Sequence, residues 1–220
     1  MIETGYDLIP EPILDYIKKY NKKRPIIPHK YHVSSLVGCL VREYYRRTIG
    51  GETVSIQSLF NMFRGTLFDE TFTPLFEKNQ KRYDVTIDKI TLTGQYDFVW
   101  DGSLWDLKMP KSVHYRKESG AGQHYLNQGK IYLAFAHYHG ELLDIDKVRI
   151  LMIAGDGVVR ETVEGDDENI MKTMFARATA LDNDLEQGKI KEILKFSVPE
   201  EPWECDSRIC FYEEICPYKL

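Results

Sequence analysis

Three charged residues, Asp97, Asp106 and Lys108, lie in a segment whose other residues favour two β-strands. Residues 91–100 are rich in Thr, Tyr, Phe, Val and Trp, and residues 103–109 follow an Asp-Gly pair that is typical of a two-residue hairpin turn. Such a turn sets the register, so we expect Asp97 to face Asp106 across the hairpin. Because side chains alternate along a strand, Lys108 is expected on the same face as Asp106.

This arrangement has two interpretations. Like charges directly opposite each other destabilise a sheet, but Mg²⁺ and Mn²⁺ prefer oxygen ligands and need few from the protein. The two carboxylates therefore predict a divalent cation between them. The alternative is a solvated hairpin with two surface acids and a lysine that forms an ordinary salt bridge.

The four cysteines are a second group of potential ligands. Cys39 stands alone, whereas Cys205, Cys210 and Cys216 crowd into the last 16 residues. Four thiolates can bind a zinc ion or a four-iron cluster. The spacing lacks the C-x-x-C pairs usual in zinc ribbons, and a proline follows Cys216, as in some iron–sulfur motifs. The spacing alone leaves both metals open, together with the alternative of buried thiols that bind nothing.

The elements that must position these residues follow from periodicity and capping. Ser34 or Ser35 is expected to cap a helix that runs to about residue 47 and carries Cys39. Further helices are predicted over 2–23, 57–78, 122–138 and 166–190, and further strands over 83–90, 147–153 and 158–163. This order predicts one α/β or α+β domain with a mixed sheet.

Composition sets broader limits. Of the 220 residues, 43% are hydrophobic, so the chain can bury a proper core. The net charge of −5 does not by itself favour nucleic acid as a partner, and DNA binding would need local basic patches. The longest apolar runs, 131–136 and 150–154, are too short to span a membrane. The N-terminal residues show no signal pattern, so we expect a cytoplasmic protein in which disulfides are not the default.

Several motifs in order resemble a known nuclease family. G-x-x-D at 94–97 and D-L-K at 106–108 resemble the core of the PD-(D/E)XK nucleases, and Q-x-x-x-Y at 128–132 resembles the motif that the RecB-like branch adds. Gly65 and Asp69 match the frame of its preceding helix motif, in which a histidine usually follows the glycine by four residues. With one cysteine before the core and three after it, residues 34–216 are similar to the iron–sulfur nucleases of this branch, including the fourth CRISPR-associated protein family and the AddB nuclease domain.

The resemblance implies a fold and a domain organisation. The fold would be α/β (α+β), a restriction-endonuclease-like core with a mixed central sheet flanked by helices and a C-terminal cysteine cluster. The chain would be one nuclease domain over 1–220, with an N-terminal helical part at 1–50, the core at 51–198 and a cysteine tail at 199–220.

The resemblance also implies roles for individual residues. Asp69, Asp97, Asp106 and the carbonyl of Leu107 would bind Mg²⁺ or Mn²⁺. Lys108 would orient the attacking water or stabilise developing negative charge. Gln128 and Tyr132 would belong to the catalytic site and support it. The four cysteines, Cys39, Cys205, Cys210 and Cys216, would bind a [4Fe-4S] cluster.

Two departures from the family pattern bear on these roles. Asp69 replaces the usual histidine, so it either serves as an oxygen ligand or weakens activity. Four residues separate Cys205 from Cys210, where relatives often have two, so the cluster loop is remodelled or the metal differs.

The expected activity is that of an exonuclease on single-stranded DNA ends, with CRISPR adaptation proteins or the recombination and repair machinery as partners. Weaker candidates for DNA contact are the basic residues Arg42, Arg46, Lys111 and Arg116. The alternative is a catalytically inactive protein that binds DNA ends as an adaptor and keeps a structural iron–sulfur cluster.

Overall fold

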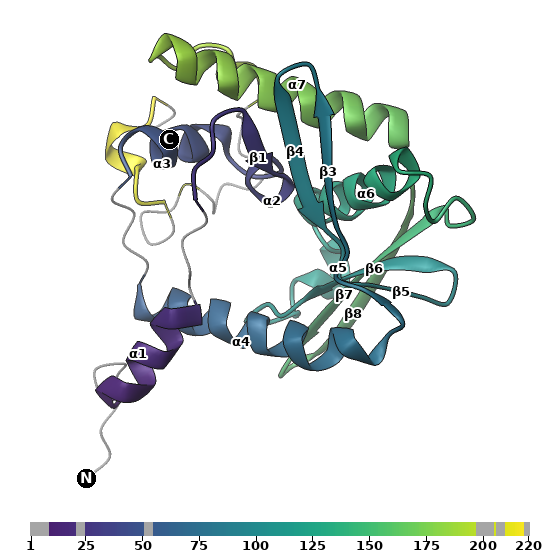
Figure 1. The fold of residues 1–220 in the computed structure, drawn as a ribbon. Coiled ribbons are helices and arrows are strands. Elements are labelled where there is room, and N and C mark those ends of the chain that lie inside the picture. The colour runs from purple at the N-terminus through teal and green to yellow at the C-terminus, as the bar shows by residue number, and fades with distance from the viewer. Residues whose placement is uncertain (1–8, 21–24, 51–54, 197–204, 206–209, 218–220) are drawn as a thin grey trace.

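The computed structural model describes residues 9–20, 25–50, 55–196, 205 and 210–217 (Figure 1). Its helices are α1 (Glu11–Tyr20), α2 (Val33–Leu36), α3 (Leu40–Thr48), α4 (Ile56–Phe72), α5 (Arg116–Ser119), α6 (Gln123–Tyr138) and α7 (Asp167–Gln187), with short 3₁₀ turns at Thr73–Leu75, Ile193–Lys195 and Glu213–Ile215. Its strands are β1 (Lys30–His32), β2 (Lys78–Asn79), β3 (Arg82–Ile87), β4 (Ile90–Gln95), β5 (Phe98–Trp100), β6 (Ser103–Lys108), β7 (Lys147–Ala154) and β8 (Gly157–Glu164).

The strands form two mixed sheets. In the first, with the order β1-β4-β3, β4 is parallel to β1 and antiparallel to β3. In the second, with the order β2-β5-β6-β7-β8, the β6–β7 pair is parallel and the other pairs are antiparallel. The predicted mixed α+β architecture is confirmed, with the strands divided between two sheets rather than placed in one.

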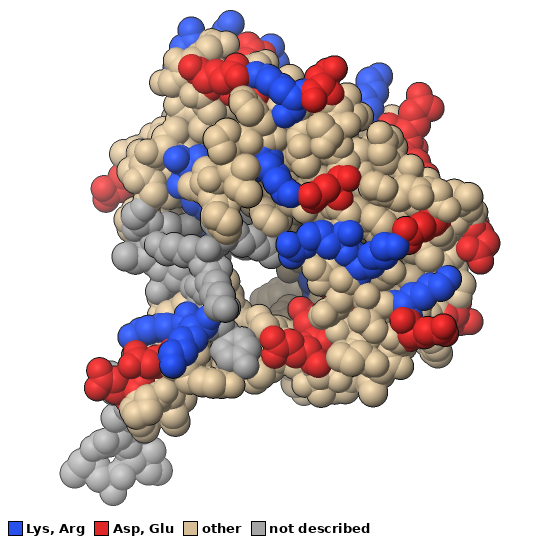
Figure 2. Space-filling view, viewed as in Figure 1, with Lys and Arg blue, Asp and Glu red and all other residues tan. Residues whose placement is uncertain are grey.

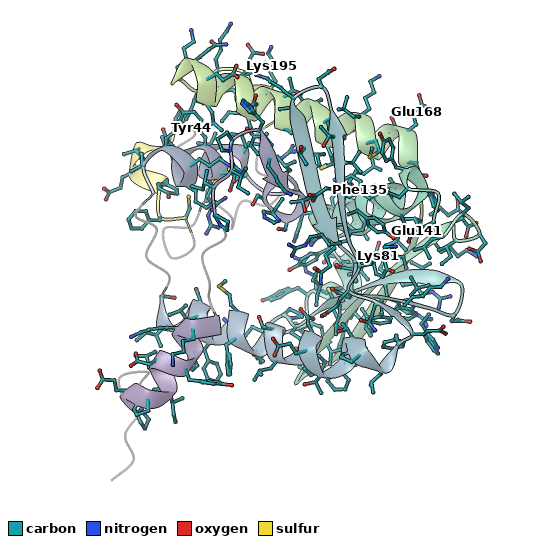
Figure 3. All side chains as sticks on the ribbon, viewed as in Figure 1. Tyr44, Lys81, Phe135, Glu141, Glu168 and Lys195 are labelled. Atoms are coloured by element: carbon teal, nitrogen blue, oxygen red, sulfur yellow. The ribbon has the colours of Figure 1, made fainter. Side chains whose placement is uncertain are left out.

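Helices flank both sheets. Figure 1 shows α7 and α4 on opposite sides of the molecule, with α6 and the strands between them. The main core joins α6, α7 and both sheets, and Phe135 of α6 is fully buried in it (Figure 3). At Gly129 of α6, a Cβ would lie 2.4 Å from Val148 Cγ1 of β7. This glycine therefore lets the helix approach the sheet closely.

A smaller apolar cluster lies between α4 and strands β5 and β6. Phe98, Trp105 and Leu107 of β5 and β6 are buried there, and Phe68 of α4 packs against them together with Phe76. Phe76 stacks on Phe98 with ring centroids 3.8 Å apart. These contacts place one face of α4 against the hairpin that carries Asp106 and Lys108.

The central hairpin has the predicted register, but its first strand is interrupted. Trp100 pairs with Ser103 and Phe98 with Trp105, as expected. The predicted strand 91–100 is divided into β4 and β5, which belong to different sheets, and residues 96–97 connect them. Tyr96 is buried beside Tyr83, with ring centroids 6.1 Å apart, so the connector is held in the core rather than in the ladder.

Helix boundaries differ from the predictions for identifiable reasons. The predicted helix from Ser34 to about residue 47 is wrong: α2 begins at Val33 after His32, and α3 begins after Cys39, whose extended backbone makes it the N-cap. The helix predicted over 57–78 ends at Phe72, where the 3₁₀ turn that contains Pro74 begins.

Two other helices are also shorter than predicted. The helix predicted over 166–190 ends before Gly188, which has the left-handed φ of 64° typical of a C-terminal stop. Residues 2–8 and 21–23 of the first predicted helix lie outside the described residues. Within the described ranges, no helix is long and apolar enough to cross a membrane.

Candidate active site

Asp97 lies in the connector between the two sheets, next to the start of β5. Its Oδ2 accepts a hydrogen bond from the backbone amide of Leu107 at 2.5 Å. The backbone pairing between β5 and β6 ends at Phe98 and Trp105. Beyond that pair, the hydrogen bond from the Leu107 amide to the Asp97 side chain connects the two segments. Asp97 therefore lies just beyond the paired residues, and its carboxylate binds the amide that follows Asp106.

Asp106 occupies the interior of the second sheet. It is only 1% exposed on β6, which lies between β5 and β7. Lys108 lies two residues along the strand, and its Nζ is 2.7 Å from Asp106 Oδ2. That distance makes an ion pair, and in the described part of the chain the buried Asp106 Oδ2 has no other close donor.

Asp69 reaches the site from α4, which is tied to the end of β6. Arg64, one turn earlier on the helix, donates through Nη2 to the carbonyls of Met109 and Pro110 at 3.1 and 3.2 Å. These residues directly follow Lys108, so the hydrogen bonds fix α4 beside the end of β6. Phe68 packs against the smaller apolar cluster next to it.

Gln128 and Tyr132 approach from α6. They are four residues apart and share a helix face, and Gln128 Nε2 donates to the Tyr132 hydroxyl at 2.7 Å. The ring of Tyr132 lies against Gly94 of β4, where a Cβ would be 2.5 Å from Tyr132 Cε1. The ring of Tyr125, from the same helix, lies 5.3 Å from the Lys108 ammonium, a cation–π distance.

Residues from each of these elements line one cavity of about 320 Å³. The seven predicted site residues are among its lining: Asp69, Asp97, Asp106, Leu107, Lys108, Gln128 and Tyr132. Figure 2 shows the molecule hollowed above α4, with acidic and basic side chains near the opening. Glu70, the exposed neighbour of Asp69, is not part of the lining.

Burial and mutual repulsion raise the pKa values of the carboxylates. Burial, followed by the charge of Asp106, raises the pKa of Asp97 to about 8, although Lys108 and the Leu107 amide oppose the shift. Burial raises the pKa of Asp69 to about 6, against the charge of Lys108 and with that of Asp106. The pKa of Asp106 is also raised by burial, against the opposing charge of Lys108.

The pKa of Lys108 moves in the direction that keeps it charged. Burial acts to lower this pKa, but the charges of Asp106 and Asp97 outweigh burial and raise it. Burial, and next the charge of Asp106, raises the pKa of Tyr132 to about 12, so its hydroxyl stays protonated at neutral pH.

The donor set fits a hard divalent cation. Three carboxylates outnumber the two basic side chains of the lining, Lys108 and Arg82, and among the described residues the buried Asp106 Oδ2 has only the Lys108 ammonium as a close partner. Oxygen donors of this kind suit Mg²⁺ or Mn²⁺. In the described part of the chain, Asp69, Asp97 and Asp106 do not each bring an oxygen within 4.8 Å of the others, so a cation bound by all three would draw them closer.

The cysteines lie in two separate segments. All four are described, half-buried and not joined by disulfides. Cys216 belongs to a tail segment that docks on α3: the Tyr45 hydroxyl donates to the Ile215 carbonyl at 2.8 Å, and Tyr45 packs against Tyr212. Figure 1 shows this C-terminal segment beside α3, whose N-cap is Cys39. Among the described residues, no three cysteine sulfurs lie within the 4.8 Å that ligands of a single ion would share.

The basic residues proposed for DNA contact lie elsewhere. Arg42, Arg46, Lys111 and Arg116 are not among the residues that line the cavity. Arg46 binds Glu43 through two hydrogen bonds of 2.6 Å, so much of its charge is neutralised. Lys111 is exposed close to the end of β6.

The sequence motifs miss five residues that line the cavity: His32, Ser34, Arg82, Thr93 and Gln95. They come from β1, the first turn of α2, β3 and β4. None belongs to a motif, and they lie together only because β1 and β3 flank β4, which the sequence pattern does not reveal.

A scan against protein-family models and a search of curated proteins found no match. Among solved structures, the chain is similar to SSO0001, with a TM-score of 0.66, 16% sequence identity and 96% of each chain covered. It also matches a phage related exonuclease from Haemophilus somnus 129PT, with a TM-score of 0.49, 13% identity, and 77% of this chain and 97% of that chain covered. The likeness to SSO0001 extends over nearly the whole chain and establishes a shared fold.

Proposed function

We propose that the chain is a DNA nuclease that depends on Mg²⁺ or Mn²⁺ and hydrolyses phosphodiester bonds. The observation that carries this proposal is the single cavity in which Asp69, Asp97, Asp106 and Lys108 meet, with Gln128 and Tyr132 on the adjacent helix. A solvated hairpin would not bury Asp106 or raise the pKa of three carboxylates together.

The carboxylates would hold the cation. Asp97 and Asp106 are the proposed ligands from the strands, Asp69 from α4, and the Leu107 carbonyl would complete the set. When bound, a divalent cation supplies a water of lowered pKa and polarises the phosphoryl oxygen. Asp97 is oriented for this role by the Leu107 amide, which leaves its other oxygen available.

Lys108 is the proposed catalytic cation. Asp106 holds its ammonium in place at 2.7 Å, and the neighbouring carboxylates keep it protonated. A fixed positive charge in a partly desolvated cavity stabilises the negative charge that develops on the phosphate. Gln128 fixes the Tyr132 hydroxyl, and together they support the site and the substrate strand.

The narrower parts of the proposal come from the motif resemblance. The substrate would be a single-stranded DNA end cleaved as by an exonuclease, and the setting would be CRISPR adaptation or DNA recombination and repair. The chain would form one nuclease domain whose cysteine tail is joined to the N-terminal part by a [4Fe-4S] cluster. The docking of Ile215 on Tyr45 supports this joining, because it holds the segment with Cys216 against the helix that begins after Cys39.

The deciding experiment is cleavage of labelled single-stranded and double-stranded DNA with Mg²⁺ or Mn²⁺. Wild type and Glu70→Gln should cut, because Glu70 is exposed outside the cavity, and Asp106→Asn should not. If Asp106→Asn cuts as well as wild type, the site is assigned wrongly. If wild type binds DNA ends but cuts neither substrate, the adaptor alternative is favoured.

A further inference from the structure

We infer that the ends of β1, β4 and β3 form a phosphate subsite in the same cavity, where Arg82 binds a non-scissile phosphate of the substrate strand. This inference rests on the proposed function and deepens it. It concerns the part of the cavity lining that contains no carboxylate ligand: His32, Ser34, Arg82, Thr93 and Gln95.

Sheet register brings these residues together. β4 is the central strand, and His32 of β1 pairs with Thr93 while Arg82 of β3 pairs with Gln95. Thr93 and Gln95 are two residues apart on β4, so they lie on one face of the sheet. Their partners therefore form a row of polar side chains across the end of the sheet, one residue before the connector that carries Asp97.

Arg82 is the cation in this row, and its charge is available. In the described part of the chain, Arg82 forms no ion pair within 4.0 Å, and its hydrogen bond to Gln95 Oε1 is long, at 3.4 Å. Asp84 shares its face of β3, but the close ion pair of Asp84 is with Lys30 at 2.5 Å. Against the opposing effect of burial, Lys30 and also the charge of Arg82 contribute to lowering the pKa of Asp84. An exposed guanidinium that lines a cavity without a carboxylate partner is suited to an anionic ligand.

Two other cations, one adjacent to Arg82 in the chain and one on β7, form ion pairs with acids. Lys81, the residue before Arg82, binds Glu141 at 2.5 Å, and the two side chains lie together in Figure 3. Arg149 binds Asp101 at 3.0 Å. Arg82 differs from Lys81 in lining the cavity and in having no close acid partner among the described residues, which makes Lys81 a matched control.

The chemistry of the row matches a phosphate. A guanidinium presents paired N–H donors that fit two phosphate oxygens, and the Ser34 hydroxyl and His32 imidazole offer further donors. A nucleic-acid strand carries one phosphate per nucleotide, so a strand whose scissile phosphate lies at Asp97 and Asp106 must place a neighbouring phosphate close by. The polar row is where the cavity can receive it.

The first test measures binding of a fluorescent single-stranded oligonucleotide in EDTA over a range of salt concentrations. Loss of one phosphate contact to a single strand lowers the slope of log affinity against log salt by about 0.7. Arg82→Gln should show this loss, Arg82→Lys should retain most of the slope, and Lys81→Gln should match wild type. Equal slopes for Arg82→Gln and Lys81→Gln would overturn the subsite.

The second test uses cleavage of oligonucleotides with one neutral methylphosphonate linkage at successive positions. In wild type, a methylphosphonate at one particular linkage, distinct from the scissile bond, should raise KM about tenfold. This is the effect of losing one charge-assisted hydrogen bond. In Arg82→Gln the same substitution should add nothing, since the contact is already absent. A penalty that persists in Arg82→Gln contradicts the inference. A wild type that binds but does not cleave contradicts the proposed function alone, because the salt slopes still decide the subsite.

Discussion

Gly94 and Tyr132 are in direct contact across the interface between β4 and α6, and a Cβ at position 94 would lie 2.5 Å from Tyr132 Cε1. Gly94 is the first residue of the G-x-x-D motif, and Tyr132 is the last residue of the Q-x-x-x-Y motif. Contact between them explains a glycine at a strand position where no turn requires one. The two motifs are therefore physically coupled, and a change at Gly94 acts on the site through Tyr132.

Gly94→Ala should displace the Tyr132 ring and lower both stability and cleavage. Overpacking of this kind costs roughly 1–3 kcal/mol, measurable by denaturant unfolding. Gly65→Ala is the control, because Gly65 lies within α4 and a Cβ there meets nothing within 4 Å. Tyr132→Ala combined with Gly94→Ala should destabilise by less than the sum of the two single changes. Strict additivity would contradict the contact.

The contribution of Asp97 to the stability of the metal-free protein should fall as pH rises from about 4 to about 8. Burial and the charge of Asp106 raise the folded-state pKa of Asp97 to about 8, so between the unfolded and folded pKa values the folded state binds the extra proton. The stabilisation that Asp97 provides therefore decreases with rising pH until Asp97 is ionised. Asp97→Asn should flatten this slope in thermal unfolding measured across the range. A slope unchanged in Asp97→Asn would show that other groups cause it.

Addition of Mg²⁺ should stabilise the protein more at pH 8 than at pH 5. Ligand carboxylates must be ionised to bind the cation, and burial holds the pKa of Asp69 near 6 and that of Asp97 near 8. The measurement is the shift in unfolding temperature with and without Mg²⁺ at each pH. An equal shift at both values would argue against binding at these carboxylates.

Asp69→Ala should impair cleavage, whereas Asp69→His should retain it by restoring the residue that is usual in the resembled family. The side chain lines the cavity from α4, and its pKa responds to Lys108 and Asp106, so it is close enough to act with them. Cleavage rates with Mn²⁺ and Mg²⁺ test both variants. Glu70→Gln should behave as wild type, and a loss in Glu70→Gln equal to that in Asp69→Ala would point to the helix as a whole.

Lys108→Met should abolish most cleavage without weakening metal binding. Loss of one group that stabilises developing charge lowers turnover by roughly 10²–10³, whereas removal of an ammonium beside Asp106 leaves the carboxylates more attractive to a cation. Calorimetric titration with Mn²⁺ should give an affinity at least equal to that of wild type. A variant that loses both would indicate that Lys108 holds Asp106 in place rather than acting on substrate.

Anaerobically purified protein should be brown and contain iron and sulfide. Cys210→Ser should then lower stability as well as iron content, because the centre would join segments distant in sequence. Metal analysis and thermal unfolding measure the two effects. Colourless protein with stoichiometric zinc would contradict the cluster.

Sequence patterns predicted the register of the β5–β6 hairpin better than the boundary between β4 and β5. The Asp-Gly turn placed Phe98 opposite Trp105 as found, because a two-residue turn allows one register. The break at residues 96–97 was missed because the strand-like composition continues through it, and only tertiary packing of Tyr96 separates β4 from β5.

The motif residues of the site were predictable, but their neighbours were not. D-L-K and Q-x-x-x-Y carry their spacing in the chain, so their members could be named in advance. β1 has three residues, too few for a periodic signal, and His32 reaches the cavity only through its parallel pairing with β4. Cys39 could be placed near a helix, but its position at the cap depends on where α2 ends.

The connector between β4 and β5 has a consequence for how this protein can vary. Asp97 lies where the chain leaves one sheet and enters the other. Its hydrogen bond to the Leu107 amide links this connector to β6 of the second sheet. The two residues between Gln95 and Phe98 thus set the spacing between the sheets. An insertion or deletion there would shift the sheet that carries Arg82 and Gln95 relative to the sheet that carries Asp106 and Lys108. This short connector must therefore keep its length for the two parts of the cavity lining to meet.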